Sequence, residues 1–314
     1  MKIAAKLAGG LALALMMSGS ALANDPESCK TVRFSDVGWT DITATTAATS
    51  VVLEALGYEP DVKILSVPVT YVALKNKDID IFLGNWMPTM EGDIKKYRED
   101  GSVETVRANL EGAKYTLAVP KATYDKGLKS FADIAKFKDD LDGKIYGIEP
   151  GNDGNRLIID MIDQNQFDLA GFEVVESSEQ GMLSQVACAT KRDKDIVFLG
   201  WEPHPMNANF EMAYLEGGDD VFGPNYGGAT VYTNVRAGYT KECPNVGKLL
   251  ENLEFSLAME NEIMGAILIE GEDPNKAAAA WLKEHPATFE SWLAGVKTID
   301  GGDSFAAVKG ALGL

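Results

Sequence analysis

Two tryptophans stand at the ends of closely similar segments, and they indicate a ligand site more directly than any other residues of the chain. Residues 78–88 read DIDIFLGNWMP and residues 193–203 read DKDIVFLGWEP. Each segment has an acidic turn, a short apolar run, a glycine, a tryptophan and then a proline. Such a run is typical of a buried parallel strand, and open α/β sheets bind ligands beyond the carboxyl ends of their strands. We therefore expect Trp86 and Trp201 to face one cleft from two sides.

Two more aromatic residues fall at comparable places. Trp39 follows a strand-like run at 32–36, and Tyr115 lies in an extended segment at 114–120. Electron-rich rings that converge on one cleft attract a cation, above all a quaternary ammonium, at about 0.5–2 kcal/mol for each ring. One such ring alone is more simply explained by core packing or by stacking on a sugar. The four together favour a cation cage made of Trp39, Trp86, Tyr115 and Trp201.

Polar residues near these rings indicate what else the ligand carries. Asp41 stands at the start of a predicted helix, and Asn152 lies in a glycine-rich turn that opens another. An ionised aspartate only accepts hydrogen bonds, so it suits a hydroxyl group and repels a carboxylate. Asp41 could equally be a helix N-cap. Asp153 or Asn155 could replace Asn152, and the turn itself could hold an anion at the helix start.

The first residues predict export. A basic start, an apolar stretch at 7–17 and the sequence ALA at 21–23 are the features of a secretory signal peptide. The apolar stretch is too short to span a bilayer. We therefore expect residues 1–23 to be removed by cleavage near Ala23 and the mature chain to be periplasmic.

The charge balance argues against some partners. The chain has 29 Lys+Arg and 47 Asp+Glu, a formal net charge of −18, and loss of the two signal-peptide lysines makes it −20. Such an acidic protein is a poor candidate for binding nucleic acid or anionic lipid. It is compatible with a cationic ligand, although solubility alone would explain the charge equally well.

Three cysteines and two histidines bound the covalent and metal chemistry. Cys188 falls in an amphipathic helical pattern and is expected to be a buried free thiol, which leaves Cys29 and Cys243 to pair in an oxidising compartment. His204 and His285 are far apart and match no zinc spacing, so we expect no metal site. No cofactor motif is present, and no cofactor is expected.

The two tryptophan segments each close a longer repeat. Residues 32–86 and 144–201 both read as strand–helix–strand–helix–strand, the unit of parallel α/β sheets, and Ser177 with Gln180 forms a capping-box pattern in the second. Extended segments at 114–120 and 228–235 would link two lobes as a hinge. The expected organisation is α/β with lobe 1 at 24–113 and 232–314 and lobe 2 at 114–231, helices from 246 onward returning to lobe 1.

These motifs resemble the periplasmic substrate-binding proteins of ABC importers for quaternary amines, the glycine betaine/choline type. The matching segments are Gly38-Trp39-Thr40-Asp41, Gly84-Asn85-Trp86-Met87-Pro88, Lys114-Tyr115-Thr116, Gly151-Asn152 and Gly200-Trp201-Glu202-Pro203-His204. The resemblance covers essentially the whole mature chain and is strongest to choline-binding members. It implies a type II two-lobe fold, choline held by the four rings, a Cys29–Cys243 disulfide and a membrane permease as partner. It also implies that Asp41 and Asn152 take the choline hydroxyl, and nothing suggests more than a monomer.

Alternatives remain open at this point. Glycine betaine, proline betaine or acetylcholine could be the ligand, with His204 as a partner for a carboxylate. An extracytoplasmic sensor would use the same two-lobe cleft but dock on a receptor. An enzyme on this fold is disfavoured because the sequence offers no nucleophile–base pair.

Overall fold

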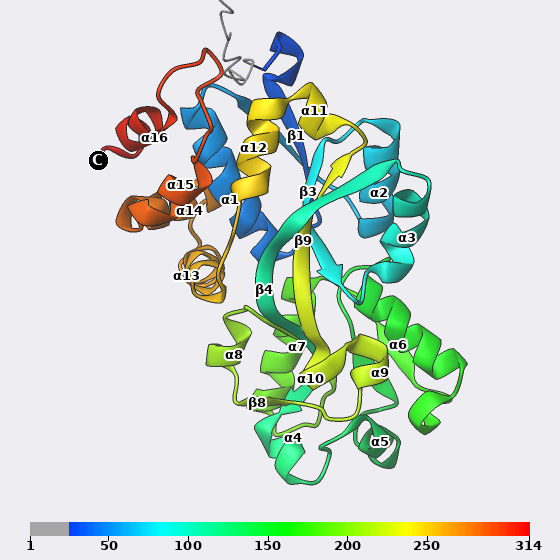
Figure 1. The fold of residues 1–314 in the computed structure, drawn as a ribbon. Helices are drawn as coiled ribbons and strands as arrows, with labels where there is room; N and C mark the ends of the chain where they lie inside the picture. The colour runs from blue at the N-terminus through cyan, green and yellow to red at the C-terminus, as the bar shows by residue number, and fades with distance from the viewer. Residues whose placement is uncertain (1–24) are drawn as a thin grey trace, which may run out of the picture.

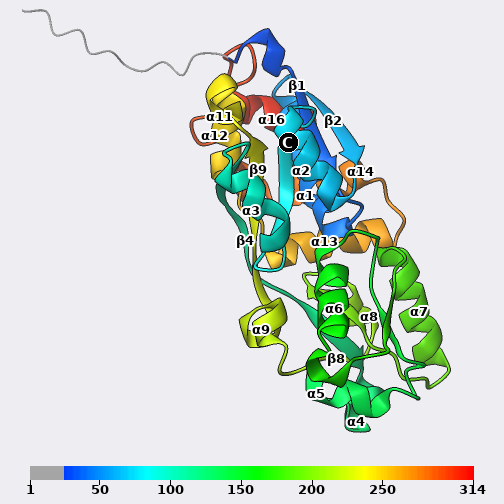
Figure 2. The same cartoon turned by 90° about the vertical axis from the view of Figure 1, so that its right-hand side faces the viewer.

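The computed structural model describes residues 25–314, so the predicted signal peptide at 1–23 lies outside the described part. The chain forms two lobes, one above the other, joined by two long strands (Figures 1 and 2). Within residues 25–314, no helix has the length and apolar composition that a bilayer span requires.

Lobe 1 is built on the first repeat. Its elements are β1 (Thr31–Asp36), α1 (Thr40–Ala55), β2 (Glu59–Ile64), α2 (Val67–Asn76) and β3 (Ile81–Met87). Strand β1 pairs in parallel with both β2 and β3, so the strand order is β2-β1-β3.

Lobe 2 repeats this arrangement. Its elements are β5 (Lys144–Tyr146), α6 (Asp153–Asp163), β6 (Glu173–Val175), α7 (Glu179–Lys191) and β7 (Phe198–Glu202). Strand β5 pairs in parallel with β6 and β7, which gives the order β6-β5-β7. The prediction of two β-α-β-α-β units is therefore confirmed.

Two long strands connect the lobes and merge their sheets. Strand β9 (Gly228–Arg236) pairs antiparallel with β3 of lobe 1, and β4 (Val103–Pro120) pairs antiparallel with β7 of lobe 2. Because β4 and β9 also pair with each other, one sheet runs β2-β1-β3-β9-β4-β7-β5-β6, with β8 (Met212–Tyr214) beside β4. The predicted hinge strands are present, and β4 is longer than the sequence pattern indicated.

Helices of the C-terminal region cover lobe 1 (Figure 1). They are α12 (Pro244–Asn252), α13 (Leu257–Leu268), α14 (Pro274–Glu284), α15 (Pro286–Trp292) and α16 (Ser304–Leu312). Helices α13, α14 and α16 pack on α1, so the C-terminal region returns to lobe 1 as the sequence predicted. The remaining short helices are η1 (Glu27–Cys29), α3 (Glu91–Glu99), α4 (Lys121–Asp125), α5 (Phe131–Ile134), η2 (Ala135–Phe137), η3 (Gln166–Asp168), α8 (Met206–Asn209), α9 (Asp219–Phe222), α10 (Pro224–Gly227) and α11 (Tyr239–Glu242).

A disulfide ties the start of the described chain to α12. Cys29 and Cys243 are bonded across 214 residues of sequence, with their Cα atoms 5.7 Å apart, and closing so long a loop stabilises the fold by a few kcal/mol in a chain-entropy estimate. Cys188 is the free cysteine, but it is partly exposed rather than buried as expected. The helical pattern placed it on α7 correctly and misjudged which side of the helix faces the core.

Helix α7 also begins differently from the prediction. Its N-cap is Ser178, whose side chain accepts the backbone N–H of Gly181, and the predicted cap Ser177 lies outside the helix. Glu179 is consequently the first residue of α7, and its side chain is buried.

Candidate ligand-binding site

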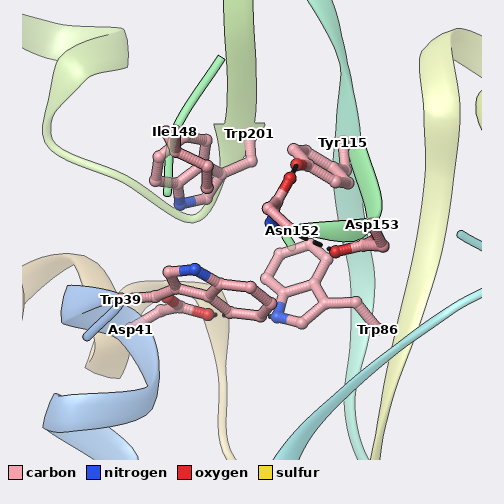
Figure 3. A pocket seen from close by; sticks show the side chains of 8 residues that line it. All are labelled: Trp39, Asp41, Trp86, Tyr115, Ile148, Asn152, Asp153 and Trp201. Atoms are coloured by element: carbon pink, nitrogen blue, oxygen red, sulfur yellow. Dashed lines mark hydrogen bonds between the residues drawn. The ribbon is translucent and has the colours of Figure 1, made fainter. Parts of the chain in front are cut away.

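A pocket of about 270 Å³ lies between the two lobes. It is smaller than the pockets of drug-sized ligands, which occupy roughly 300–1,000 Å³. All six residues predicted to bind the ligand line it (Figure 3), together with two that were not: Trp39, Asp41, Trp86, Tyr115, Asn152 and Trp201, with Ile148 and Asp153.

The sheet positions the rings. Trp86 and Trp201 lie at the carboxyl ends of β3 and β7, and Trp39 immediately precedes α1. Tyr115 on β4 is the direct cross-strand partner of Trp201. The Tyr115 ring stands edge-on to Trp86 and to Trp201, with centroids 6.1 Å and 6.2 Å away. Four rings from both lobes and from a connecting strand therefore enclose one space.

A glycine makes room for the central ring. A Cβ atom on Gly154 in α6 would stand 2.1 Å from the hydroxyl oxygen of Tyr115. Real Cβ atoms do not approach other atoms so closely, so glycine at this position is what permits Tyr115 to reach the first turn of α6. The tyrosine hydroxyl then donates to the Asn152 side chain at 2.8 Å.

Asp41 presents a free acceptor to the pocket. It is 1% exposed; its Oδ2 accepts the indole N–H of Trp86 at 3.1 Å, while its Oδ1 has no partner among the described residues. Burial, together with the nearby Glu179, raises its pKa to about 8. Because α1 begins at Thr40 and its N-cap position is Trp39, the alternative reading of Asp41 as an N-cap is wrong.

Asn152 presents a donor from the other lobe. It is the N-cap of α6, and its Oδ1 accepts the backbone N–H of Asn155 and the hydroxyl of Tyr115. Its amide N–H donates to Asp153 Oδ1 at 3.2 Å, which fixes the orientation of the amide and leaves its second N–H for a ligand. Asn152 therefore serves both as the N-cap of α6 and as a pocket residue.

Of the two substitutes considered for Asn152, only Asp153 lines the pocket. Its Oδ2 has no partner among the described residues, and burial raises its pKa to about 6. Asn155 instead braces the preceding loop, accepting the backbone N–H of Ile148 and donating to the carbonyls of Ile148 and Glu149. An anion at the start of α6 would meet the Asp153 carboxyl, so the anion reading of this turn is disfavoured.

His204 is occupied elsewhere. Its Nδ1 accepts the backbone N–H of Met206 at 2.9 Å, so Nε2 carries the hydrogen and donates to Glu179 Oε1 at 3.2 Å. Both ring nitrogens are therefore used, and His204 is not among the residues that line the pocket.

The electrostatics of the pocket select for positive charge. Its lining includes two carboxyl groups and, among the described residues, no lysine, arginine or histidine. Just behind the rings, Glu149 accepts the indole N–H of Trp39 at 2.9 Å, and burial raises the pKa of that carboxyl to about 7. Crowded, desolvated carboxyl groups of this kind are relieved by a cation placed among them.

Two lobes on a shared sheet, with a ligand pocket between them, define a substrate-binding protein of the two-lobe type. The chain belongs to the family described as the substrate-binding domain of ABC-type glycine betaine transport systems, which it matches over residues 30–284. Members of this family are transport proteins that work outside the cytoplasm, which confirms the predicted class and the prediction that the chain is not an enzyme.

Solved structures place the chain more narrowly. It is 75% identical to an ABC-transporter choline binding protein in complex with choline, with 92% of this chain and 100% of that chain covered and a TM-score of 0.91. An unliganded semi-closed choline binding protein is 76% identical over the same shares, with a TM-score of 0.85. Lactococcal OpuAC, closed on glycine betaine, is 26% identical over 84% of this chain and 99% of its own, with a TM-score of 0.75. These neighbours are type II periplasmic binding proteins, so the predicted fold is confirmed.

Sequence reasoning missed residues whose roles depend on contacts between the lobes. Ile148 ends a strand-like run and carried no chemical signal, and Asp153 was named only as a substitute. Glu149 and Glu179 were not singled out, because their hydrogen bonds to Trp39 and Thr40 join residues more than 100 positions apart.

Proposed function

We propose that this chain captures choline in the cleft and delivers it to a membrane permease. The observation that carries the proposal is the pairing of a four-ring cage with one free acceptor, Asp41 Oδ1, and one free donor, the second N–H of Asn152. Trimethylammonium suits the rings, since it is a cation without a strong hydration shell. A hydroxyl group both donates and accepts, so it matches the two polar groups together.

Other quaternary amines fit this set of groups less well. Glycine betaine and proline betaine end in a carboxylate, which would lie beside Asp41 and Asp153, and no basic side chain of the described part of the chain lines the pocket. His204 cannot compensate, because both of its ring nitrogens have partners. Acetylcholine ends in an ester, which has no hydrogen to donate to Asp41.

Binding by closure of the two lobes follows from the same geometry. The hinge would lie near residues 112–119 and 226–235, with lobe 1 at 24–113 and 232–314 and lobe 2 at 114–231. The ligand stabilises the closed state to the extent that it binds that state more tightly than the open one. The protein would act in the periplasm as a monomer after cleavage near Ala23, and the closed form would dock on the permease.

Calorimetric titration of the mature protein tests the proposal. Ligand carried over from expression is removed by unfolding and refolding, and choline and glycine betaine are titrated in parallel. We expect choline to bind at least about 100-fold more tightly. A betaine carboxylate beside Asp41 and Asp153 either meets like charge or requires both carboxyl groups to stay protonated, and it has no hydrogen to donate to Asp41. Tighter binding of betaine would overturn choline as the ligand, and absence of heat with either would overturn the cage.

A further inference from the structure

Helix α1 has an unusual start. Its N-cap position is Trp39, which offers no side-chain oxygen to the first backbone N–H groups, although such groups need partners when they are buried. The partner comes from lobe 2 instead: Glu179 Oε2 accepts the Thr40 backbone N–H at 2.8 Å, and Glu179 Oε1 accepts the Thr40 hydroxyl at 2.6 Å. The helix that carries Asp41 is thus capped by the opposite lobe.

Contacts within lobe 2 hold the Glu179 side chain in the position from which it caps α1. Its Oε1 also accepts the Nε2–H of His204, whose tautomer is fixed by the backbone of Met206. The His204 ring packs edge-on against Trp201, with centroids 4.8 Å apart. A continuous series of contacts therefore runs from a cage ring of lobe 2 through Glu179 to the first turn of α1.

We propose that Glu179 is a positioning residue for ligand binding, a strap that caps α1 only when the cleft is closed and thereby holds Asp41 in place and slows ligand release. The inference rests on the proposed function for the identity of the ligand, but not for the strap itself. All three partners of Glu179 are donors, and the side chain is 1% exposed, so opening would leave the Thr40 N–H and the carboxyl to be solvated by water.

The hydrogen bonds of Glu179 differ from the other polar contacts between the lobes, because they reach the backbone of the helix that carries Asp41. Trp39 donates to Glu149 across the cleft, and Arg156 donates to Asp93 at 2.8 Å, but neither contact involves the backbone of a helix that carries a ligand residue. The Arg156 pair is also partly exposed, and such pairs contribute little. The hydrogen bonds of Glu179 therefore link closure of the lobes to the position of Asp41.

Substitution of Glu179 by glutamine is the main test. A glutamine has one acceptor oxygen and one NH₂ group, so it places a donor either against the Thr40 backbone N–H or against the Thr40 hydroxyl and His204. We expect Glu179→Gln to weaken choline binding by about 10- to 100-fold, almost wholly through faster dissociation in stopped-flow tryptophan fluorescence. Glu211→Gln, the same change at an exposed site of lobe 2, should alter neither rate.

A second variant separates the strap from the charge of Glu179. Thr40→Val removes the donor hydroxyl and leaves every charge in place, and we expect dissociation to become about 3- to 10-fold faster. Thr46→Val, in the same helix, is its control, because the Thr46 hydroxyl is buried and has no partner within residues 25–314. The double variant Glu179→Gln/Thr40→Val should lose less than the product of the two single effects, as expected for residues in one contact.

A ligand-independent readout keeps the two proposals apart. Spin labels on Lys95→Cys in α3 and Asp160→Cys in α6, in a Cys188→Ser background, report the distance between the lobes. Fewer closed molecules in the Glu179 and Thr40 variants would support the strap even if wild-type protein bound no quaternary amine, which would sink only the proposed function. Unchanged dissociation and unchanged lobe distances, or a fall in the melting temperature of the ligand-free protein alone, would overturn the strap.

Discussion

The two helices that open toward the ligand, α1 of lobe 1 and α6 of lobe 2, occupy equivalent places in two copies of one unit. Helix α6 is complete in itself, since Asn152 caps it and still offers an N–H to the pocket. Helix α1 is not, since its cap comes from Glu179 of the other lobe and, within the part of the chain that the structure describes, Asp41 Oδ1 has no hydrogen-bond partner. The two copies of the repeat supply similar rings from both sides of the pocket, and they differ in the polar groups at the start of α1 and of α6.

This difference gives the pocket a direction. The strand ends deliver Trp86 and Trp201 almost symmetrically, and rings alone would hold a trimethylammonium without regard to the rest of the molecule. An acceptor on one side and a donor on the other fit a hydroxyl, and the cross-lobe cap makes the acceptor side depend on closure. A duplicated scaffold can therefore bind an asymmetric ligand by varying only the first turn of each helix.

The largest expected effect compares the two tryptophans. We expect Trp86→Ala to lower choline affinity by at least about 100-fold and Trp201→Ala by about 30-fold, because a desolvated ring contributes about 2 kcal/mol and Trp86 also donates to Asp41. Calorimetry measures both, and Trp86→Phe, which keeps a ring without the N–H, should fall between wild type and Trp86→Ala. Equal losses from the two alanine variants would mean that the Trp86–Asp41 hydrogen bond adds nothing.

The next test addresses the acceptor side directly. Asp41→Asn keeps the size of the side chain but replaces one acceptor oxygen with an NH₂ group. We expect choline to bind about 10- to 100-fold more weakly and glycine betaine to bind as well as before or better, since an ionisable carboxyl has been replaced by an amide that can donate to a carboxylate. Parallel titrations give the ratio of the two affinities, and an unchanged ratio would remove Asp41 from hydroxyl recognition.

A smaller effect is expected on the α6 side. Gly154→Ala should weaken choline binding by about 10-fold, because the new Cβ displaces Tyr115 at a cost of about 1–3 kcal/mol. Gly265→Ala in α13 is the matched control, since no atom lies within 4 Å of its Cβ position. That control should leave binding unchanged and raise the free energy of unfolding by about 1 kcal/mol. Unaltered binding in Gly154→Ala would show that Tyr115 can shift freely.

The smallest expected effect is a pH dependence that originates mainly in lobe 1. Burial raises the pKa of Asp41 from 3.8 to about 8, so the ligand-free fold loses stability from this group as the pH rises from about 4 to about 8. A bound cation favours the ionised form, and choline affinity should rise several-fold over the upper part of that range, with proton release. Calorimetry in buffers of different ionisation heat measures that release.

The Asp41→Asn variant identifies the source of the pH dependence. The variant should lose most of the pH dependence of choline affinity and keep the part due to Asp153 and Glu149, whose pKa values are raised to about 6 and about 7. An affinity that does not change with pH in the wild type would contradict an uncharged Asp41 in the ligand-free protein.

Local patterns were enough to predict the fold and the rings. Strand ends followed by tryptophan are read from a few adjacent residues, and the order of strands and helices in each repeat is likewise local. The role of Asp41 could not be settled in the same way, because a shift of one or two residues in the helix start decides between an N-cap and a first-turn residue. The same uncertainty moved the cap of α7 from Ser177 to Ser178 and left Glu179 unnoticed.

Contacts between the lobes could not be predicted from the sequence. The hydrogen bond from Thr40 to Glu179 joins residues 139 positions apart, and no periodicity marks either residue as its partner. The predicted burial of Cys188 was wrong for a related reason, since an apolar helical pattern does not fix which side of the helix its neighbours cover.

The path of the chain through lobe 1 has a consequence for biosynthesis. Lobe 1 receives β1 to β3 at the beginning of translation and β9 with its covering helices only at the end, whereas lobe 2 lies almost entirely between them. A chain made from its N-terminus can therefore finish lobe 2 while lobe 1 still lacks β9 and the helices that follow it. The bond from Cys29 to Cys243 can form only after β9 has been made, so the incomplete lobe 1, with its indole rings uncovered, is the stage at which a nascent molecule is most exposed to aggregation and to proteases.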